Sequence, residues 1–215
     1  MSRSTERRHV EGDREQEIRD ATLEVLAESG YDRLTMDAVA TKAKASKATL
    51  YRRWSSKEGL VIDAVEHMRH AADLPDTGAL RDDLQALSCG VGGLADTTTV
   101  STFAGVLTAL ARDPDFAEAF RRDFVGPKVA TSRQLWERAQ ERGEVHAAVD
   151  LDLFESALAG IVLHRMFVTG DVPDPHTIAR VIDQIIMPAA SGGPDTQHRL
   201  SNRVSVGDDQ VPETK

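Results

Sequence analysis

No proline precedes Pro75, and the apolar residues of this long stretch recur three and four positions apart. This spacing is typical of amphipathic helices, whereas half-buried strands alternate apolar and polar residues. One such stripe predicts a helix over residues 14–29, and Gly30 is placed to end it. The N-terminal third is therefore expected to fold as a set of short packed helices.

Hydroxyl residues stand where the next helices are expected to begin. Thr35 precedes a short apolar stripe that ends near residues 42–43, and Ser46 precedes another over 47–53. Ser55 and Glu58 have the S-x-x-E spacing of a capping box, so a longer helix is expected from there towards Ala71. Two short helices joined by a turn of about three residues, behind a supporting helix, are typical of a helix-turn-helix DNA reader.

Beyond Pro75 the same periodicity predicts further helices and favours no strand. Asp113-Pro114 and Asp174-Pro175 are helix-start signals, whereas Gly126-Pro127 is expected to interrupt a helix. The expected helices cover residues 80–94, 100–111, 114–124, 129–142, 150–169 and 174–187. The chain is thus predicted to be all-α, with about nine to ten helices.

Four parts are expected: a flexible arm over residues 1–13, a helix-turn-helix domain over 14–60, a regulatory and dimerisation domain over 61–190, and a disordered tail over 191–215. The weakly polar stretch 157–169 is too short to span a membrane, and no apolar core follows the first arginines as a secretory signal requires. The lone Cys89 fits a reducing compartment. We therefore expect a cytoplasmic protein with no membrane partner.

The net charge of −9 conceals an uneven distribution of charges. Residues 1–60 hold 12 Lys and Arg against 11 Asp and Glu, whereas residues 61–215 hold 14 against 24. Within the first part, residues 38–57 hold six basic residues and no acid. A merely solvated surface helix usually mixes both signs, so this basic segment favours contact with nucleic-acid phosphates.

Leu50 is predicted to point inward, so its neighbours on 47–53 must point outward. The residues expected to face base edges in the major groove are Lys47, Ala48, Tyr51 and Arg52. The groups expected to meet phosphates are the side chains of Arg53 and Lys57 and the backbone N–H groups that follow Thr35 and Ser46.

The runs TMDAVA (35–40), ASKATLYRRW (45–54) and SKEGL (56–60) resemble the DNA-binding block of the tetracycline-repressor (TetR) family of one-component transcriptional regulators. The resemblance covers residues 30–60. It implies phosphate contacts at Thr35, Thr49, Tyr51, Arg53 and Lys57, and base contacts at Lys47, Ala48 and Tyr51. One departure is Lys44, which lies in the turn where the family most often has glycine, so a strained positive φ is expected there.

The predicted helices over 150–169 and 174–187 are apolar on more than one face, so each must bury a second face. A reader of one half-site gains affinity by pairing on a palindrome, so these helices are expected to pack against their copies as a four-helix bundle, as the family does. The alternative is that both complete the core of one chain. The residues expected at the dimer interface are Phe154, Leu158, Ile161, Val162, Ile178, Val181, Ile182 and Ile185.

Bulky residues of the middle helices are candidates to line a largely apolar cavity for an unidentified small-molecule effector. They are Phe103, Leu107, Phe120, Phe124, Trp136, His164 and Phe167. Ordinary core packing explains each of them equally well.

Signals of catalysis are weak. His67 and His70 lack the order of a zinc-binding H-E-x-x-H motif, and the glycines of 90–93 lack the Lys-Ser/Thr that ends a phosphate-binding loop. Ser132 and Ser156 have no recognisable base. We therefore predict a non-enzymatic transcriptional repressor without metal or cofactor, a homodimer that binds palindromic double-stranded operator DNA and is released by an effector. The alternative is a helical ligand-binding or structural dimer that does not bind DNA.

Overall fold

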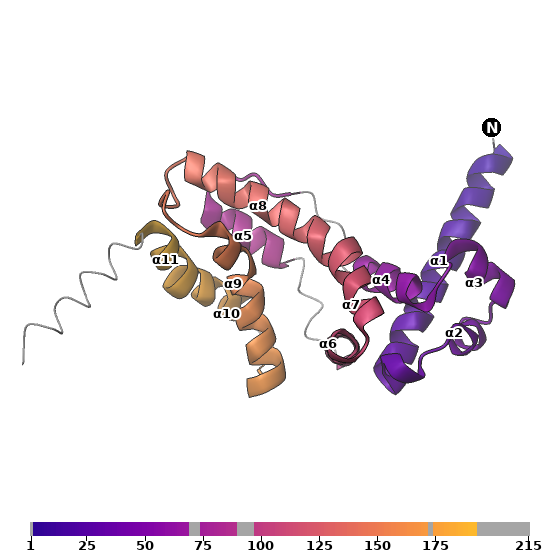
Figure 1. Ribbon diagram of the computed structural model, residues 1–215. Coiled ribbons are helices and arrows are strands. Elements are labelled where there is room, and N and C mark those ends of the chain that lie inside the picture. The colour runs from indigo at the N-terminus through magenta and orange to yellow at the C-terminus, as the bar shows by residue number, and fades with distance from the viewer. Residues whose placement is uncertain (1, 69–73, 90–96, 172–173, 193–215) are drawn as a thin grey trace, which may run out of the picture.

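The computed structural model describes residues 2–68, 74–89, 97–171 and 174–192. Every regular element within these ranges is helical, which confirms the all-α class. Figure 1 shows α1–α4 at one end of the molecule, α5 and α8–α11 at the other, and α6 and α7 between them. The predicted tail beyond residue 192 and the helix ends expected near residues 71 and 94 lie outside the described ranges.

The N-terminal end is built on one long helix. The elements there are α1 (Ser2–Ser29), the single 3-10 turn η1 (Tyr31–Arg33), α2 (Met36–Lys42), α3 (Lys47–Arg53) and α4 (Lys57–His67). Gly30, with a φ of +75°, ends α1 as expected. The helix begins at Ser2, so the segment expected as a flexible arm continues α1. The apolar stripe marked only the packed part of the helix, whereas the Glu and Arg residues before it favour helix without packing.

The cap of α4 differs from the sequence prediction by one residue. Ser56 has extended backbone angles, and its hydroxyl oxygen accepts a hydrogen bond from the Gly59 N–H at 3.1 Å. Ser55, predicted as the cap, lies outside the helix. Glu58 is then in the first turn and accepts a hydrogen bond from the Tyr31 hydroxyl at 3.2 Å, so it is not the reciprocal partner of a capping box.

The remaining helices form the middle and the far end of the molecule. They are α5 (Leu80–Cys89), α6 (Thr97–Arg112), α7 (Pro114–Phe120), η3 (Arg121–Val125), α8 (Gly126–Glu141), α9 (Leu151–His164), η4 (Arg165–Thr169), α10 (Pro175–Val181), η5 (Ile182–Ile186) and α11 (Met187–Gly192). Asp113 and Asp174 cap α7 and α10, each with proline in the first turn, as predicted.

Two single π-helical turns, η3 and η5, join helices that the sequence divides or ends, whereas a third, η4, extends α9 to Thr169, directly before Gly170. Gly126-Pro127 does not interrupt the helix as predicted, because α7, η3 and α8 are continuous. A proline ring normally clashes with the carbonyl four residues earlier, and the wider turn before Pro127 relieves that clash. In the same way η5 precedes Pro188, so the last helix passes its expected end near Met187 and reaches Gly192.

The apolar core of the N-terminal end continues into α6 and α7. Tyr31, Phe116, Phe120 and Phe124 form a row of aromatic rings whose successive centroids are 4.4, 5.6 and 4.5 Å apart. These rings belong to the same buried cluster as residues of α1–α4. A second cluster holds α5, α8, α9 and the α10–α11 helix together.

The shift of the α4 cap gives a direct test by substitution. Ser56→Ala removes the acceptor for the Gly59 N–H and is expected to lower the free energy of unfolding by about 1 kcal/mol. Ser55→Ala removes no cap and is expected to change it by less than about 0.5 kcal/mol. Urea unfolding of both variants measures the difference, and equal losses would contradict the assignment of Ser56 as the cap.

Candidate nucleic-acid interface

Helices α2 and α3 are each started by a hydroxyl side chain. The Thr35 oxygen accepts a hydrogen bond from the Ala38 N–H at 3.1 Å, and the Ser46 oxygen accepts one from the Thr49 N–H at 3.1 Å. In the turn between the helices Lys44 has a φ of +51°, the positive value expected where the family usually has glycine. These features confirm the predicted helix-turn-helix geometry.

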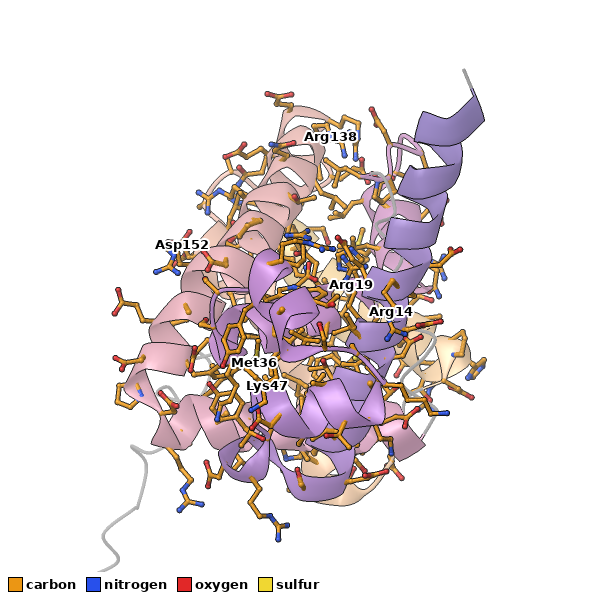
Figure 2. The ribbon with its side chains drawn as sticks, turned by 90° about the vertical axis from the view of Figure 1, so that its right-hand side faces the viewer. Arg14, Arg19, Met36, Lys47, Arg138 and Asp152 are labelled. Carbon is orange, nitrogen blue, oxygen red and sulfur yellow. The ribbon has the colours of Figure 1, made fainter. Side chains whose placement is uncertain are left out.

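The outward face of α3 holds the residues predicted to read bases. Leu50 is fully buried, whereas Tyr51 is 54% exposed. Lys47, Ala48 and Arg52 are also exposed, and Thr49 is half-buried beside them. Figure 2 labels Lys47 together with Arg14 and Arg19 of the neighbouring α1. The structure thus brings the predicted base-facing residues together on one accessible surface, and their contacts with bases stay a prediction.

Nearby carboxylates already bind two of the predicted DNA-contacting cations. Lys47 Nζ lies 2.6 Å from Asp37 Oδ2, and this hydrogen bond holds the pKa of Lys47 above its ordinary value. Arg53 Nε lies 3.2 Å from Glu15 Oε1. The Lys47–Asp37 pair is exposed and the Arg53–Glu15 pair is half-buried at Glu15, and ion pairs that water reaches contribute little stability. Phosphates can therefore displace these carboxylates at little cost.

Lys57, which is predicted to meet a phosphate, packs against η1 in the structure. Its Nζ donates to the Tyr31 carbonyl oxygen at 3.1 Å and lies 3.8 Å from the centre of the Tyr31 ring. The lysine thus packs on η1 in the absence of DNA. Burial raises the pKa of the Tyr31 hydroxyl strongly, and the neighbouring Glu58 carboxylate adds to this. A phosphate contact by Lys57 requires its flexible side chain to leave this position.

A polar network fixes the end of α3 to α1 and α4. Trp54, directly after α3, is buried, and its Nε1 donates to Asp63 Oδ2 at 2.9 Å. The same oxygen accepts from Arg19 Nε at 2.8 Å. Arg19 is 6% exposed, and its Nη2 also meets Glu15 Oε2 at 3.2 Å. This network sets the position of α3 relative to α1 and α4.

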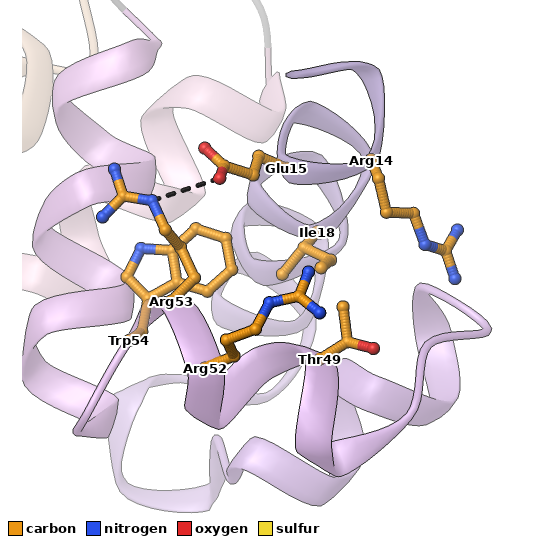
Figure 3. Close-up of a pocket in the computed structure, with 7 residues that line it drawn as sticks. All are labelled: Arg14, Glu15, Ile18, Thr49, Arg52, Arg53 and Trp54. Carbon is orange, nitrogen blue, oxygen red and sulfur yellow. Dashed lines mark ion pairs between the residues drawn. The ribbon is translucent and has the colours of Figure 1, made fainter. Parts of the chain in front are cut away.

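A pocket of about 380 Å³ lies between α1 and α3 beside this network. Figure 3 shows the residues that line it and the ion pair between Arg53 and Glu15. The lining residues are Arg14, Glu15, Ile18, Thr49, Arg52, Arg53 and Trp54. Three arginines against one carboxylate make this surface cationic, which suits phosphate rather than an apolar molecule.

Sequence reasoning missed the residues that position α3. The spacing of Glu15 and Arg19, four apart on one helix, was a signal for an ion pair. The contact of Asp63 with both Arg19 and Trp54 joins residues far apart in sequence, and no local pattern announces it.

The candidate effector residues do not come together around one described cavity. Phe120 and Phe124 lie in the buried cluster of the N-terminal end, Trp136 lies in the second cluster, and Phe103 and Phe167 pack beside a third around Met166. His164 and Leu107 are exposed. Neither described pocket is lined by any of the seven. Their role in effector binding therefore stays a prediction.

Four of the eight residues predicted at a dimer interface are buried inside the single chain. They are Val162, Ile178, Val181 and Ile182. The last three pack in the second cluster, where α10 and η5 contact α5, so their apolar stripe serves the chain's own core. Ile185 is 51% exposed, and Phe154, Leu158 and Ile161 are half-buried. Of the eight predicted residues these four keep surface for a partner, and Leu153 and Val168 on the same helices are 69% and 72% exposed.

Within the described ranges, no group of three or more His, Cys, Asp or Glu is arranged to hold a metal ion. No helix in those ranges has the length and apolar character needed to cross a membrane.

Comparisons with known proteins agree with this geometry. Residues 18–64 match the family described as bacterial regulatory proteins, tetR family, and residues 74–185 match the tetracyclin repressor-like, C-terminal domain. An uncharacterised HTH-type transcriptional regulator of Mycobacterium tuberculosis is 38% identical over 180 residues, which cover 82% of this chain and 87% of the relative.

Two more relatives extend the comparison. A DNA-binding transcriptional repressor of Mycobacteroides abscessus is 33% identical over 169 residues, 77% of this chain and 87% of that protein. The crystal structure of a TetR family transcription regulator, 28% identical, superposes with a TM-score of 0.61 and covers 80% of this chain and 96% of its own.

The capped α2–α3 pair, its exposed face and its cationic surroundings define a helix-turn-helix transcriptional regulator. With both halves of the chain matched, this protein belongs to the TetR family.

The network around Asp63 can be tested by removing its charge. Asp63→Asn leaves the buried Arg19 with one carboxylate fewer and is expected to lower the free energy of unfolding by about 2 kcal/mol. Asp20→Asn, on the exposed side of α1, is the matched control and is expected to change it by less than about 0.5 kcal/mol. If chemical denaturation finds both variants equally stable, the network does not support the fold.

Proposed function

We propose that the protein is a cytoplasmic transcriptional repressor that binds a palindromic operator as a homodimer and leaves it when a small molecule binds residues 61–190. The observation that carries the proposal is the exposed α3 face, with Lys47, Tyr51 and Arg52 outward over the buried Leu50. The relative from Mycobacteroides abscessus is named as a repressor, which supports repression rather than activation.

The helix-turn-helix would contact both the base edges and the phosphate backbone of DNA. Lys47, Ala48, Tyr51 and Arg52 on α3 would meet base edges in the major groove. The groups that would hold phosphates are the N–H groups at the starts of α2 and α3 and the side chains of Thr35, Ser46, Thr49, Arg53 and Lys57. On binding, phosphates would replace Asp37 at Lys47 and Glu15 at Arg53. No step of this action makes or breaks a covalent bond.

The dimer surface would lie on the exposed apolar residues of the last helices. Among the described residues of these helices, the large apolar side chains that are exposed are Leu153, Val168 and Ile185. Two copies joined through α9 and the α10–α11 helix would place two α3 helices on successive major grooves, about 34–36 Å apart.

An effector would act on the helix-turn-helix through the apolar core that α6 and α7 share with α1–α4. A molecule that shifts α6 or α7 would move Phe116 against Tyr31, and with it α1 and α4. The spacing of the two reader helices would then no longer fit one face of DNA. In the second cluster, the Trp136 Nε1 is buried without a hydrogen-bond partner among the described residues, so it is a candidate polar contact for such a molecule.

A salt series tests DNA binding. Duplexes are recovered from fragmented genomic DNA retained by the protein at low salt, and their affinity is measured by fluorescence anisotropy. We expect the logarithm of the association constant to fall linearly with the logarithm of salt concentration, by about 0.9 for each phosphate bound. Lys57→Ala should weaken all sequences alike and reduce the slope by about 0.9, whereas Lys47→Ala should change the preferred sequence.

The results have distinct meanings. Retention of no genomic fragment at low salt would reject the DNA-binding function and favour a helical ligand-binding or structural dimer. Binding with identical changes in the two lysine variants would keep DNA binding and reject the roles given to Lys47 and Lys57.

The dimer surface is tested by placing a charge on it. Ile185→Lys is expected to convert the protein from dimer to monomer in sedimentation equilibrium, because a lysine would be buried against the partner. Val129→Lys is the control, since Val129 is similarly exposed, at 43%, but lies on α8. A wild-type monomer, or an Ile185→Lys variant that remains dimeric, would contradict the proposed surface.

A further inference from the structure

The turn η1 lies where α4, α6 and α7 meet. The Tyr31 side chain is 3% exposed, and its ring centroid lies 4.4 Å from that of Phe116 on α7. Its hydroxyl donates a hydrogen bond to Glu58 Oε1 on α4 at 3.2 Å. The next residue, Asp32, forms an ion pair with Arg112 at the end of α6 at 3.2 Å. A movement of α6 or α7 therefore reaches η1 directly.

Lys57 is the cation that η1 holds. It is half-buried at the first position of α4. Its Nζ donates to the Tyr31 carbonyl oxygen at 3.1 Å and lies 3.8 Å from the centre of the Tyr31 ring. Because the N-terminus of a helix favours anions, a lysine there needs a compensating partner. That partner is η1 in this structure and would be a phosphate in the complex with DNA.

The contact of Lys57 with η1 differs from the ion pairs of the other predicted DNA-contacting cations. Lys47 and Arg53 pair with carboxylates at the ends of side chains that water reaches. Tyr31 is buried between Phe116 and α4, so its ring cannot follow Lys57 outward. An ammonium gains from an aromatic ring only within about 6 Å of the ring centre. When Lys57 swings out to a phosphate, it therefore loses the contact with the ring.

Space beside η1 allows this turn to shift. A groove of about 570 Å³ is lined by the end of α1 and by η1 on one side, and by small residues of α6, among them Ala104 and Gly105, on the other. A closely packed interior resists displacement, whereas an unfilled groove on one side permits it. The Tyr31 ring can thus change its distance from Lys57 when α7 changes position.

We propose that Tyr31 is a positioning residue for DNA binding: its ring and carbonyl hold Lys57 away from the phosphate, and the position of α7 sets how strongly they hold it. The proposal rests on the proposed DNA-binding function and names a route of regulation within it. Because coupling between two sites is reciprocal, a shift of α7 that presses the ring against Lys57 weakens DNA binding, and capture of Lys57 by a phosphate favours the opposite shift.

The test is a double-mutant cycle on the full chain, with affinity measured on a duplex that the wild-type protein retains from genomic DNA. Tyr31→Leu keeps the carbonyl and an apolar side chain but removes the ring. Tyr31→Phe is the conservative variant, because it keeps the ring and removes only the hydroxyl. Both substitutions are repeated together with Lys57→Ala, and urea unfolding establishes that every variant is folded in the binding assay.

Tyr31→Leu is expected to bind the duplex roughly two- to fivefold more tightly than the wild type, because Lys57 no longer gives up a cation–π contact. Tyr31→Phe should restore wild-type affinity, and Tyr31→Leu should have no effect when Lys57→Ala is also present. Unchanged or weaker binding by Tyr31→Leu, or an equal gain with and without Lys57→Ala, overturns the proposal while leaving DNA binding intact.

The link to α7 is tested in the same cycle. Phe116→Leu removes the ring that packs on Tyr31 and is expected to give a smaller gain in affinity than Tyr31→Leu, again only while Lys57 is present. A gain that persists together with Lys57→Ala, or no gain at all, overturns the link to α7.

A second measurement needs no substitution in the core. In the free protein the Tyr31 ring should shift the NMR signals of the Lys57 ε-methylene group upfield, and their loss in Lys57→Ala identifies them. These signals are expected to move to ordinary lysine values when the duplex is added. Signals that stay upfield in the complex overturn the proposal, and a wild-type protein that retains no genomic fragment overturns the proposed function as well.

Discussion

The carboxylate of Asp63 joins three helices at one point, and the position of the reader depends on it. One of its oxygens accepts from Arg19 on α1 and from the indole of Trp54 at the end of α3, while Asp63 itself belongs to α4. Because Trp54 and Arg19 are buried, water cannot easily replace these hydrogen bonds. The direction of α3 is thus set by α4, the helix that leads to the C-terminal half.

The basic surface around α3 is balanced by the protein's own acids. Asp37 holds Lys47, Glu15 holds Arg53, and Glu28 and Glu24 hold Lys42, whose pKa is raised chiefly by the hydrogen bond to Glu28. These carboxylates occupy the cations until a stronger anion arrives. In the proposed complex DNA would displace these carboxylates, which would therefore lower affinity for weak polyanions more than for a duplex that engages all the cations at once.

Local patterns in the sequence were sufficient for much of the fold. The caps at Thr35, Ser46, Asp113 and Asp174 and the inward Leu50 depend on a few adjacent residues, so spacing alone predicts them. The passage of the chain through Pro127 depends on a π-helical turn, which no short pattern signals.

The site was predicted less completely than the fold. The outward residues of α3 follow from Leu50, but the positions of Lys57 on Tyr31 and of Asp63 beneath Trp54 depend on contacts between distant segments. For the same reason the apolar stripe of Ile178, Val181 and Ile182 predicts a dimer interface or, alternatively, a place in the core of one chain, and in the structure it packs within the chain. An apolar stripe shows that one face of a helix is buried, but it does not show which element covers that face.

The row of rings from Tyr31 through Phe116 to Phe124 limits where two such proteins can be joined to make a chimera. The ring of η1 is covered by residues of α7, and Leu26 of α1 lies so close to Gly105 of α6 that a side chain there would press on it. A chimera made by cutting after α4 would leave this apolar surface open to water and prone to association. The unit to exchange is therefore α1–α4 together with α6 and α7. A chimera that transfers all of these helices keeps their shared apolar core buried.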